Sequence, residues 1–204
     1  MIIKVCGMRE AENIKDVDNI DAVNWMGFIF FPKSKRHVES LPSYMPRNSK
    51  RVGVFVNAEK DDILTKCHEY GFDIIQLHGN EDADYCQSLR HLLDKSIKII
   101  KMIQVSDNTD IRSVSKYEDV VDYFLFETKC QSYGGSGTQF DWNILEQYEG
   151  SRPFLITGGI TPDDAEKVKA FHHPMFAGID LNSKFETSPA FKNVEAIKAF
   201  VANF

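Results

Sequence analysis

Eight short apolar runs alternate with helix-like segments along the chain, and this alternation predicts an α/β fold with a parallel sheet. Covered parallel sheets occur as open doubly wound sheets or as closed (β/α)8 barrels. The count of eight favours the barrel. In addition, no G-x-G-x-x-G or G-x-x-x-x-G-K-S/T motif follows the first run, where an open nucleotide-binding sheet most often carries one. We therefore expect a single-domain (β/α)8 TIM barrel over residues 1–204.

The expected strands are apolar runs rich in β-branched and aromatic residues. They cover Ile2–Cys6, Trp25–Phe30, Arg51–Asn57, Asp73–Leu77, Ile97–Met102, Tyr123–Glu127, Phe154–Thr157 and Phe176–Asp180.

The expected helices lie between these runs. They cover Glu10–Val17, Pro42–Asn48, Glu59–Tyr70, Glu81–Leu93, Asp107–Lys116, Trp142–Tyr148, Pro162–Phe171 and Val194–Phe204. Pro162 occupies a first-turn position after Thr161, and Asp163 and Asp164 complement the helix dipole there. The stretch Lys129–Gly137 directly follows the sixth strand and is the most loop-like part of the chain, as expected of a loop at an active-site face.

Composition restricts the class of protein. Hydrophobic residues make up 43% of the chain, which is enough to fill a sizeable core. The 24 Lys and Arg against 30 Asp and Glu argue against a nucleic-acid or anionic-membrane surface, which needs a basic face. No two of the four cysteines form a C-x-x-C pair, so we expect reduced thiols. No stretch approaches the roughly 18 apolar residues of a membrane span, and the first apolar run is too short for a signal peptide. We expect a cytoplasmic protein, monomeric or homodimeric, that acts on a small molecule.

Polar side chains follow the expected strands at their C-terminal ends, where barrels of this kind carry their active sites. A thiol, a guanidinium, an imidazole, two carboxylates and a glycine pair should therefore meet at one rim. The residues are Cys6, Arg36, His78, Glu127, Gly158, Gly159 and Asp180.

Several of these strand ends carry motifs that resemble the phosphoribosylanthranilate isomerase family over essentially the full length. The motifs are Lys4-Val5-Cys6-Gly7, Gln76-Leu77-His78-Gly79-Asn80-Glu81, Gly134-Gly135-Ser136-Gly137 followed by Phe140-Asp141-Trp142, and Gly158-Gly159-Ile160. The resemblance implies an Amadori rearrangement of N-(5-phosphoribosyl)anthranilate to 1-(2-carboxyphenylamino)-1-deoxyribulose 5-phosphate in tryptophan biosynthesis. It implies a small phosphorylated substrate and no cofactor, and no His, Asp or Glu set has convincing metal-ligand spacing.

This reaction needs an acid that protonates the furanose ring oxygen and a base that removes the proton from C2 of the resulting Schiff base. The resemblance places Cys6 as the base and Glu127 as the acid. A thiol acts as a base only in its thiolate form. Because Lys4 and Cys6 face the same side of a strand, we expect Lys4 to stabilise the thiolate and lower its pKa.

The resemblance also supplies binding residues. Arg36 matches the position that holds the anthranilate carboxylate, and His78 and Asp180 have supporting contacts with the substrate. Barrels often bind phosphate after their last two strands. We expect phosphate to bind at Gly158 and Gly159, with further donors from the eighth-strand loop, namely Asn182, Ser183 and Lys184.

The sequence departs from the family at three places. Glu127 replaces the usual aspartate, Thr138 replaces a common lysine, and Asn182-Ser183-Lys184 replaces a Ser-Ser-Gly run. Blander interpretations stay open: Cys6 as a core residue, Glu127 as an ion-pair partner of Lys129, and Gly158-Gly159 as a plain turn. The alternative functions are another phosphate-binding barrel enzyme that acts on a similar ribosyl-amine, or a barrel that binds a phosphorylated metabolite without catalysis.

Overall fold

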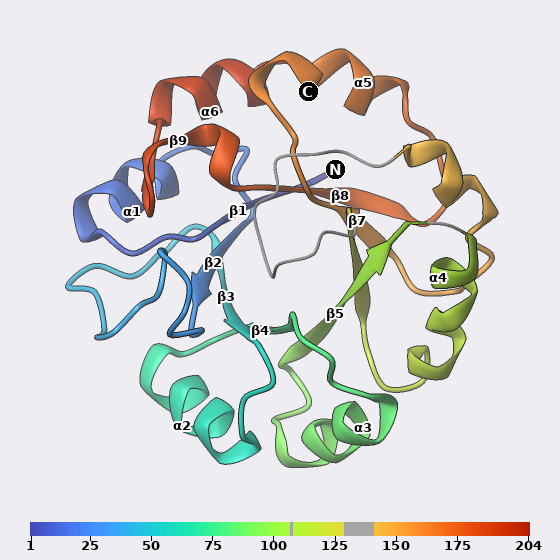
Figure 1. Ribbon diagram of the computed structural model, residues 1–204. Coiled ribbons are helices and arrows are strands. Elements are labelled where there is room, and N and C mark those ends of the chain that lie inside the picture. Colours follow the sequence, from blue (N-terminus) through green and yellow to red (C-terminus); the bar gives the residue numbers. More distant parts are fainter. Residues whose placement is uncertain (107, 129–140) are drawn as a thin grey trace.

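The computed structural model describes residues 1–106, 108–128 and 141–204. Eight parallel strands close into a barrel in chain order, which confirms the expected fold (Figure 1). Each expected strand is present, and its ends differ from the expected ones by at most three residues. The strands are β1 Ile2–Cys6, β2 Trp25–Ile29, β3 Lys50–Phe55, β4 Ile74–Leu77, β5 Lys98–Val105, β6 Tyr123–Thr128, β7 Phe154–Ile156 and β8 Phe176–Leu181.

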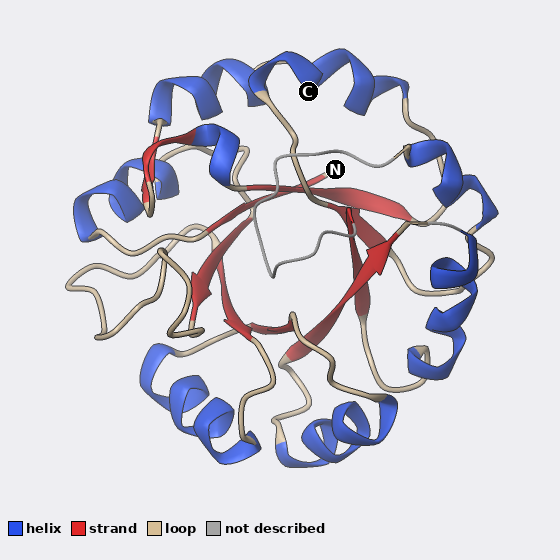
Figure 2. Cartoon of the chain, viewed as in Figure 1, coloured by secondary structure: helices blue, strands red, loops and turns tan. Residues whose placement is uncertain are grey.

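Helices surround the barrel (Figure 2). They are α1 Ala11–Asp18, α2 Lys60–Tyr70, α3 Ala83–Leu92, α4 Asn108–Arg112, α5 Ala165–Ala170 and α6 Val194–Val201, and short 3-10 turns are η1 Ser113–Tyr117, η2 Trp142–Gln147, η3 Pro162–Asp164 and η4 Ser183–Phe185. The start signal at Pro162 is present as a capping box, in which the Thr161 backbone N–H donates to Asp164 Oδ2 at 2.7 Å. Nowhere in the described ranges is a helix both long and apolar enough to cross a membrane.

Buried apolar side chains form two clusters on opposite faces of the strands. One cluster fills the space between the barrel and its helices and includes Ile3 and Val5 of β1. The other consists of the alternate strand positions and includes Cys6 and Trp25. Cys6 therefore lies on the barrel interior, with its side chain at the C-terminal end of β1.

The helix expected over Pro42–Asn48 is wrong, because this segment has no helical structure. Pro46 has no backbone N–H to donate and disfavours helical geometry in the preceding residue. The segment instead surrounds the Asp18 carboxylate at the end of α1. That carboxylate accepts hydrogen bonds from Arg47 N at 2.8 Å and Ser49 N at 3.0 Å, and also from the Tyr44 hydroxyl at 2.8 Å. Burial raises the pKa of Asp18, but these hydrogen bonds outweigh burial and hold it below its usual value.

A hairpin after β8 was not expected from the sequence. Strand β9 Glu186–Ser188 pairs antiparallel with β10 Phe191–Lys192, and this hairpin leads into α6. The expected loop Lys129–Gly137, with the Gly134–Gly137 motif and Thr138, lies outside the described residues.

Candidate functional site

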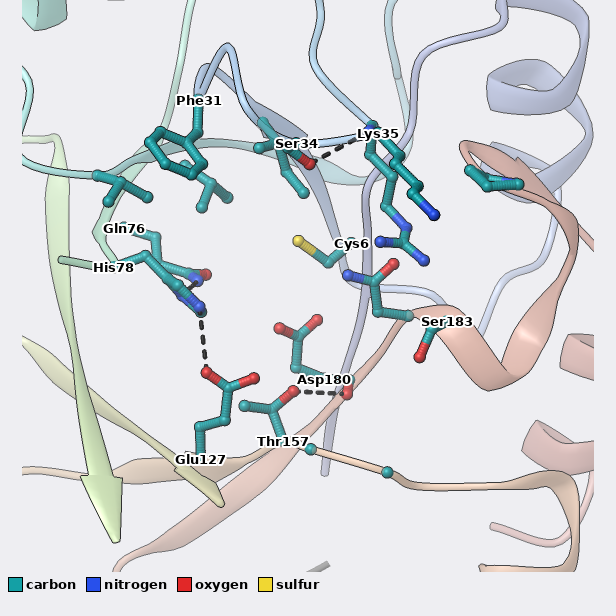
Figure 3. A pocket seen from close by; sticks show the side chains of 18 of the residues that line it. Cys6, Phe31, Ser34, Lys35, Gln76, His78, Glu127, Thr157, Asp180 and Ser183 are labelled. Atoms are coloured by element: carbon teal, nitrogen blue, oxygen red, sulfur yellow. Dashed lines mark hydrogen bonds and ion pairs between the residues drawn. The ribbon is translucent and has the colours of Figure 1, made fainter. Parts of the chain in front are cut away.

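A cavity of about 410 Å³ opens at the C-terminal ends of the strands (Figure 3). The structure brings nearly all the sequence-predicted site residues to its lining: Cys6, Arg36, His78, Glu127, Gly158, Gly159, Asp180, Asn182 and Ser183. Lys184 is the exception, because it is exposed and does not line the cavity. The volume suits a small, substrate-sized ligand.

Cys6 lies at the end of β1 next to a glycine of β2. A Cβ atom at Gly27 would lie 2.7 Å from Cys6 Sγ, so a glycine leaves the space that the thiol occupies. Lys4 lies two residues before Cys6, on the same face of β1. It is completely buried and donates to Asp180 Oδ2 at 2.8 Å. Lys4 and Asp180 are register partners in the β1–β8 pair, so both side chains point into the barrel.

The pKa of the Cys6 thiol is raised, not lowered as expected. Burial is the largest cause and disfavours the thiolate, whereas the nearby Lys4 charge works in the opposite direction. Lys4 lowers the thiol pKa as expected, but burial outweighs it, and the Asp180 carboxylate that shares the Lys4 ammonium also disfavours a second negative charge. In the free site, Cys6 is therefore mainly a thiol.

Glu127 lies near the C-terminal end of β6 and is buried. Its Oε2 lies 3.2 Å from His78 Nε2, and Figure 3 shows the two side chains facing each other. The Gln76 amide nitrogen lies 2.8 Å from the other ring nitrogen, His78 Nδ1. With the amide in this orientation, Nδ1 accepts a hydrogen bond from Gln76, so Nε2 carries the ring hydrogen on the side that faces Glu127.

Gln76 was not predicted as a site residue. Its spacing was a usable signal, because Gln76 and His78 are two residues apart at the end of β4 and share a face of the strand. Thr157 also lines the cavity and was not predicted as a site residue. It follows β7 and donates from Oγ1 to the Asp180 carbonyl at 3.2 Å.

Buried acceptors form the floor of the cavity. Within the described part of the chain, Gln76 Oε1 and Asp180 Oδ1 have no hydrogen-bond partner, and Glu127 Oε2 has only its 3.2 Å contact with His78. A buried acceptor without a donor costs about 1–3 kcal/mol. The floor is therefore suited to a ligand that presents hydroxyl or amine hydrogens.

Donors lie around the rim of the cavity. The Arg36 guanidinium binds the Glu186 carboxylate through Nε at 2.8 Å and Nη2 at 2.6 Å. Gly7 makes room for it, because Gly7 has φ +78° and a Cβ atom there would lie 2.6 Å from Arg36 Cδ. Gly158 and Gly159, with φ +93° and +70°, adopt the left-handed backbone that favours glycine. Such a turn lets the chain approach an anion closely.

The comparisons with known proteins agree on one family. The family model described as N-(5'phosphoribosyl)anthranilate (PRA) isomerase matches residues 3–203. The N-(5'-phosphoribosyl)anthranilate isomerase of Phocaeicola vulgatus is 48% identical over 201 residues, covering 98% of this chain and 96% of its own. That of Parabacteroides distasonis is 46% identical, covering 98% and 92%.

Solved structures agree with the sequence comparisons. The phosphoribosyl anthranilate isomerase of Thermotoga maritima superposes with a TM-score of 0.83 at 30% identity, covering all of this chain and 98% of that one. An isomerase solved in complex with reduced 1-(o-carboxyphenylamino)-1-deoxyribulose 5-phosphate gives a TM-score of 0.80 at 27% identity, with the same coverage. The resemblance inferred from the strand-end motifs is confirmed. The chain belongs to the N-(5'-phosphoribosyl)anthranilate isomerase family.

Proposed function

We propose that this chain, an isomerase of tryptophan biosynthesis by its family, rearranges N-(5'-phosphoribosyl)anthranilate with Glu127 as the acid and Cys6 as the base. One observation carries the assignment: buried acceptors form the floor of the cavity, and the donors lie at its rim. The substrate has the complementary layout, with hydroxyl and amine hydrogens in the middle and an anionic group at either end. The ligand named for one solved relative has the same layout.

The two anionic ends have different partners. Arg36 binds the anthranilate carboxylate, since a planar guanidinium matches a carboxylate fork. The turn at Gly158 and Gly159, with the polar side chains of Asn182 and Ser183, binds the phosphate. Lys184, which is exposed, contributes only its charge to this edge. His78 and Asp180 hold the middle of the substrate.

Glu127 starts the reaction by donating its proton to the furanose ring oxygen. The bond between C1 and this oxygen breaks, which leaves a hydroxyl group and a protonated Schiff base at C1. The contact with His78 lies at Glu127 Oε2, so we assign delivery of the proton to the other carboxyl oxygen, Oε1.

Cys6 completes the rearrangement by taking the proton from C2. The C–H electron pair forms the C1=C2 bond and neutralises the Schiff base, and the resulting enol then becomes the ketone of the product by moving its proton to C1. Because burial raises the pKa of Cys6, only a minor thiolate population is present to act. The Lys4 ammonium is the positive charge that stabilises it.

The assignment is tested by generating the substrate in situ and following the loss of its fluorescence. We expect Glu127→Gln and Cys6→Ala to lose roughly 10²- to 10⁴-fold in kcat and still bind a product analogue. Turnover equal to that of the unaltered protein in either variant would show that the group lies elsewhere. An unaltered protein that binds the analogue without turnover would be a non-catalytic barrel.

We further propose that residues 1–204 form one catalytic domain, that the protein acts in the cytoplasm, and that it is a monomer or a homodimer without a cofactor. The Thermotoga maritima relative is described as a dimeric enzyme from which monomers were generated, and its chain is 27% identical to this one. Light scattering coupled to size-exclusion chromatography measures the oligomeric state directly.

A further inference from the structure

Lys192, on β10 of the hairpin after β8, is a buried charge that the proposed mechanism does not use. Its Nζ donates to Glu186 Oε1 at 2.6 Å and to Asn182 Oδ1 at 2.8 Å. Its backbone is held by Asn13 of α1, which accepts from Lys192 N at 2.7 Å and donates to Lys192 O at 3.0 Å. The ammonium is therefore kept at a defined position beside the cavity.

The first partner, Glu186, connects Lys192 to Arg36. Its carboxylate binds the edge of the guanidinium formed by Nε and Nη2. Within the described part of the chain, Arg36 Nη1 has no hydrogen bond, so the end formed by Nη1 and the second Nη2 hydrogen is available. This end is a two-donor fork, which suits the carboxylate of a ligand. Burial raises the pKa of Glu186, but Arg36 and Lys192 outweigh it and hold the carboxylate ionised.

The second partner is the side-chain amide of Asn182, which lines the cavity on the phosphate side. A lysine ammonium can only donate, so it binds the amide oxygen of Asn182 and turns the NH2 group away from itself. The amide then presents hydrogens, which an anion requires. Without Lys192, the amide is free to turn its oxygen toward the ligand.

We propose that Lys192 is a positioning residue that orients both anion-binding groups at once, Arg36 through Glu186 and the Asn182 amide directly. The inference rests on the proposed function, because it takes Arg36 and Asn182 as ligand-binding residues. It predicts that one side chain that does not line the cavity controls affinity for both ends of the substrate. A purely structural ion pair would change stability without changing the two ends together.

The test uses two simple probes as competitive inhibitors: benzoate for the carboxylate end and inorganic phosphate for the phosphate end. We expect Lys192→Met to weaken both probes by about 10- to 100-fold and to raise KM more than it lowers kcat, because charged hydrogen bonds are lost at both ends. Glu186→Gln should weaken benzoate and leave phosphate within about threefold, since it disturbs only the link to Arg36. Lys198→Met, on the exposed side of α6, is the matched control and should change neither.

Each outcome decides the proposal. A folded Lys192→Met variant that leaves either probe unaffected would overturn the shared role, as would equal loss of both probes in Glu186→Gln. If Lys192→Met does not fold, the double variant Lys192→Met/Glu186→Gln replaces it, because it leaves no unpaired charge in the hairpin. Arg36→Lys separates this inference from the proposed function. If Arg36→Lys leaves the affinity for benzoate unchanged, the assignment of Arg36 to the carboxylate fails. If Arg36→Lys weakens benzoate but Lys192→Met does not, only the role of Lys192 is overturned.

Discussion

Shortening Glu127 by one methylene, in Glu127→Asp, is expected to slow the reaction even though it restores the residue usual in the family. Glu127 pairs in regular register with Gln104 on β5, and no bulge interrupts the β5–β6 pairing at this position. The extra length therefore serves to bring Oε2 to 3.2 Å from His78 Nε2. Removing one carbon–carbon bond withdraws the carboxylate by about 1.5 Å, beyond hydrogen-bond distance from His78.

A catalytic group misplaced by about 1 Å costs on the order of 10²-fold in rate, so kcat for Glu127→Asp should fall by about that factor. This corresponds to a barrier higher by about 2.7 kcal/mol. Glu127→Gln keeps the length and the contact with His78 but cannot donate the acid proton. We therefore expect Glu127→Gln to be the slower of the two variants.

The measurement is kcat from fluorescence loss at saturating substrate, with Glu195→Asp on the exposed face of α6 as the control for a shortened glutamate. Analogue affinity, measured separately, should change little in either Glu127 variant. A Glu127→Asp enzyme as fast as the unaltered protein would refute the argument that glutamate length sets the geometry. A Glu127→Gln enzyme with full turnover would refute the acid role itself and make Asp180 the next candidate.

Three further predictions concern other parts of the molecule. Asp18→Ala should lower the free energy of unfolding by about 1–3 kcal/mol, because it removes the acceptor of the buried Ser49 N–H and of part-buried donors on Tyr44 and Arg47. Asp21→Ala, at an exposed position, should lie within about 0.5 kcal/mol of the unaltered protein in urea melts. Since the pKa of Asp18 is lowered in the folded state, its contribution to stability is complete above the unfolded pKa of about 4 and is lost as the pH falls toward the folded value. A stability difference between Asp18→Ala and the unaltered protein that is as large at pH 3 as at pH 7 would contradict this. Alkylation of Cys6 by iodoacetamide, read by peptide mass spectrometry, should still be accelerating at pH 9, because the raised pKa keeps the thiolate a minor species there; a rate that levels off below pH 9 would contradict the raised pKa. Gly7→Ala should raise KM, because its Cβ would lie 2.6 Å from the arginine side chain of the site, whereas Gly71→Ala, also at positive φ but at the end of α2, should cost stability and leave KM unchanged.

The strands could be predicted from the sequence because each is buried on both faces of a closed parallel sheet and therefore reads as an apolar run. The candidate site was predictable for a related reason. A barrel places all the C-terminal strand ends at one rim, so Cys6, His78, Glu127 and Asp180 meet there, although they are spread over the whole chain.

The partners of these residues were not predictable. Glu186 lies 150 positions from Arg36, and β9 and β10 are three and two residues long, too short to show a periodic pattern. The helix predicted over Pro42–Asn48 is absent because the backbone N–H groups of this region bind the Asp18 carboxylate at the end of α1. That carboxylate supplies the acceptors that a helix would have provided.

The thiol of Cys6 shows where the boundary lies. The alternation of side chains along a strand is local, so the sequence by itself determined that Lys4 and Cys6 share the interior face of β1. The register of β1 against β8 is a tertiary property, and it places Asp180 opposite Lys4. Burial and this carboxylate together decide that the thiol pKa is raised, because desolvation and the sharing of one ammonium depend on neighbours that only the closed barrel brings together.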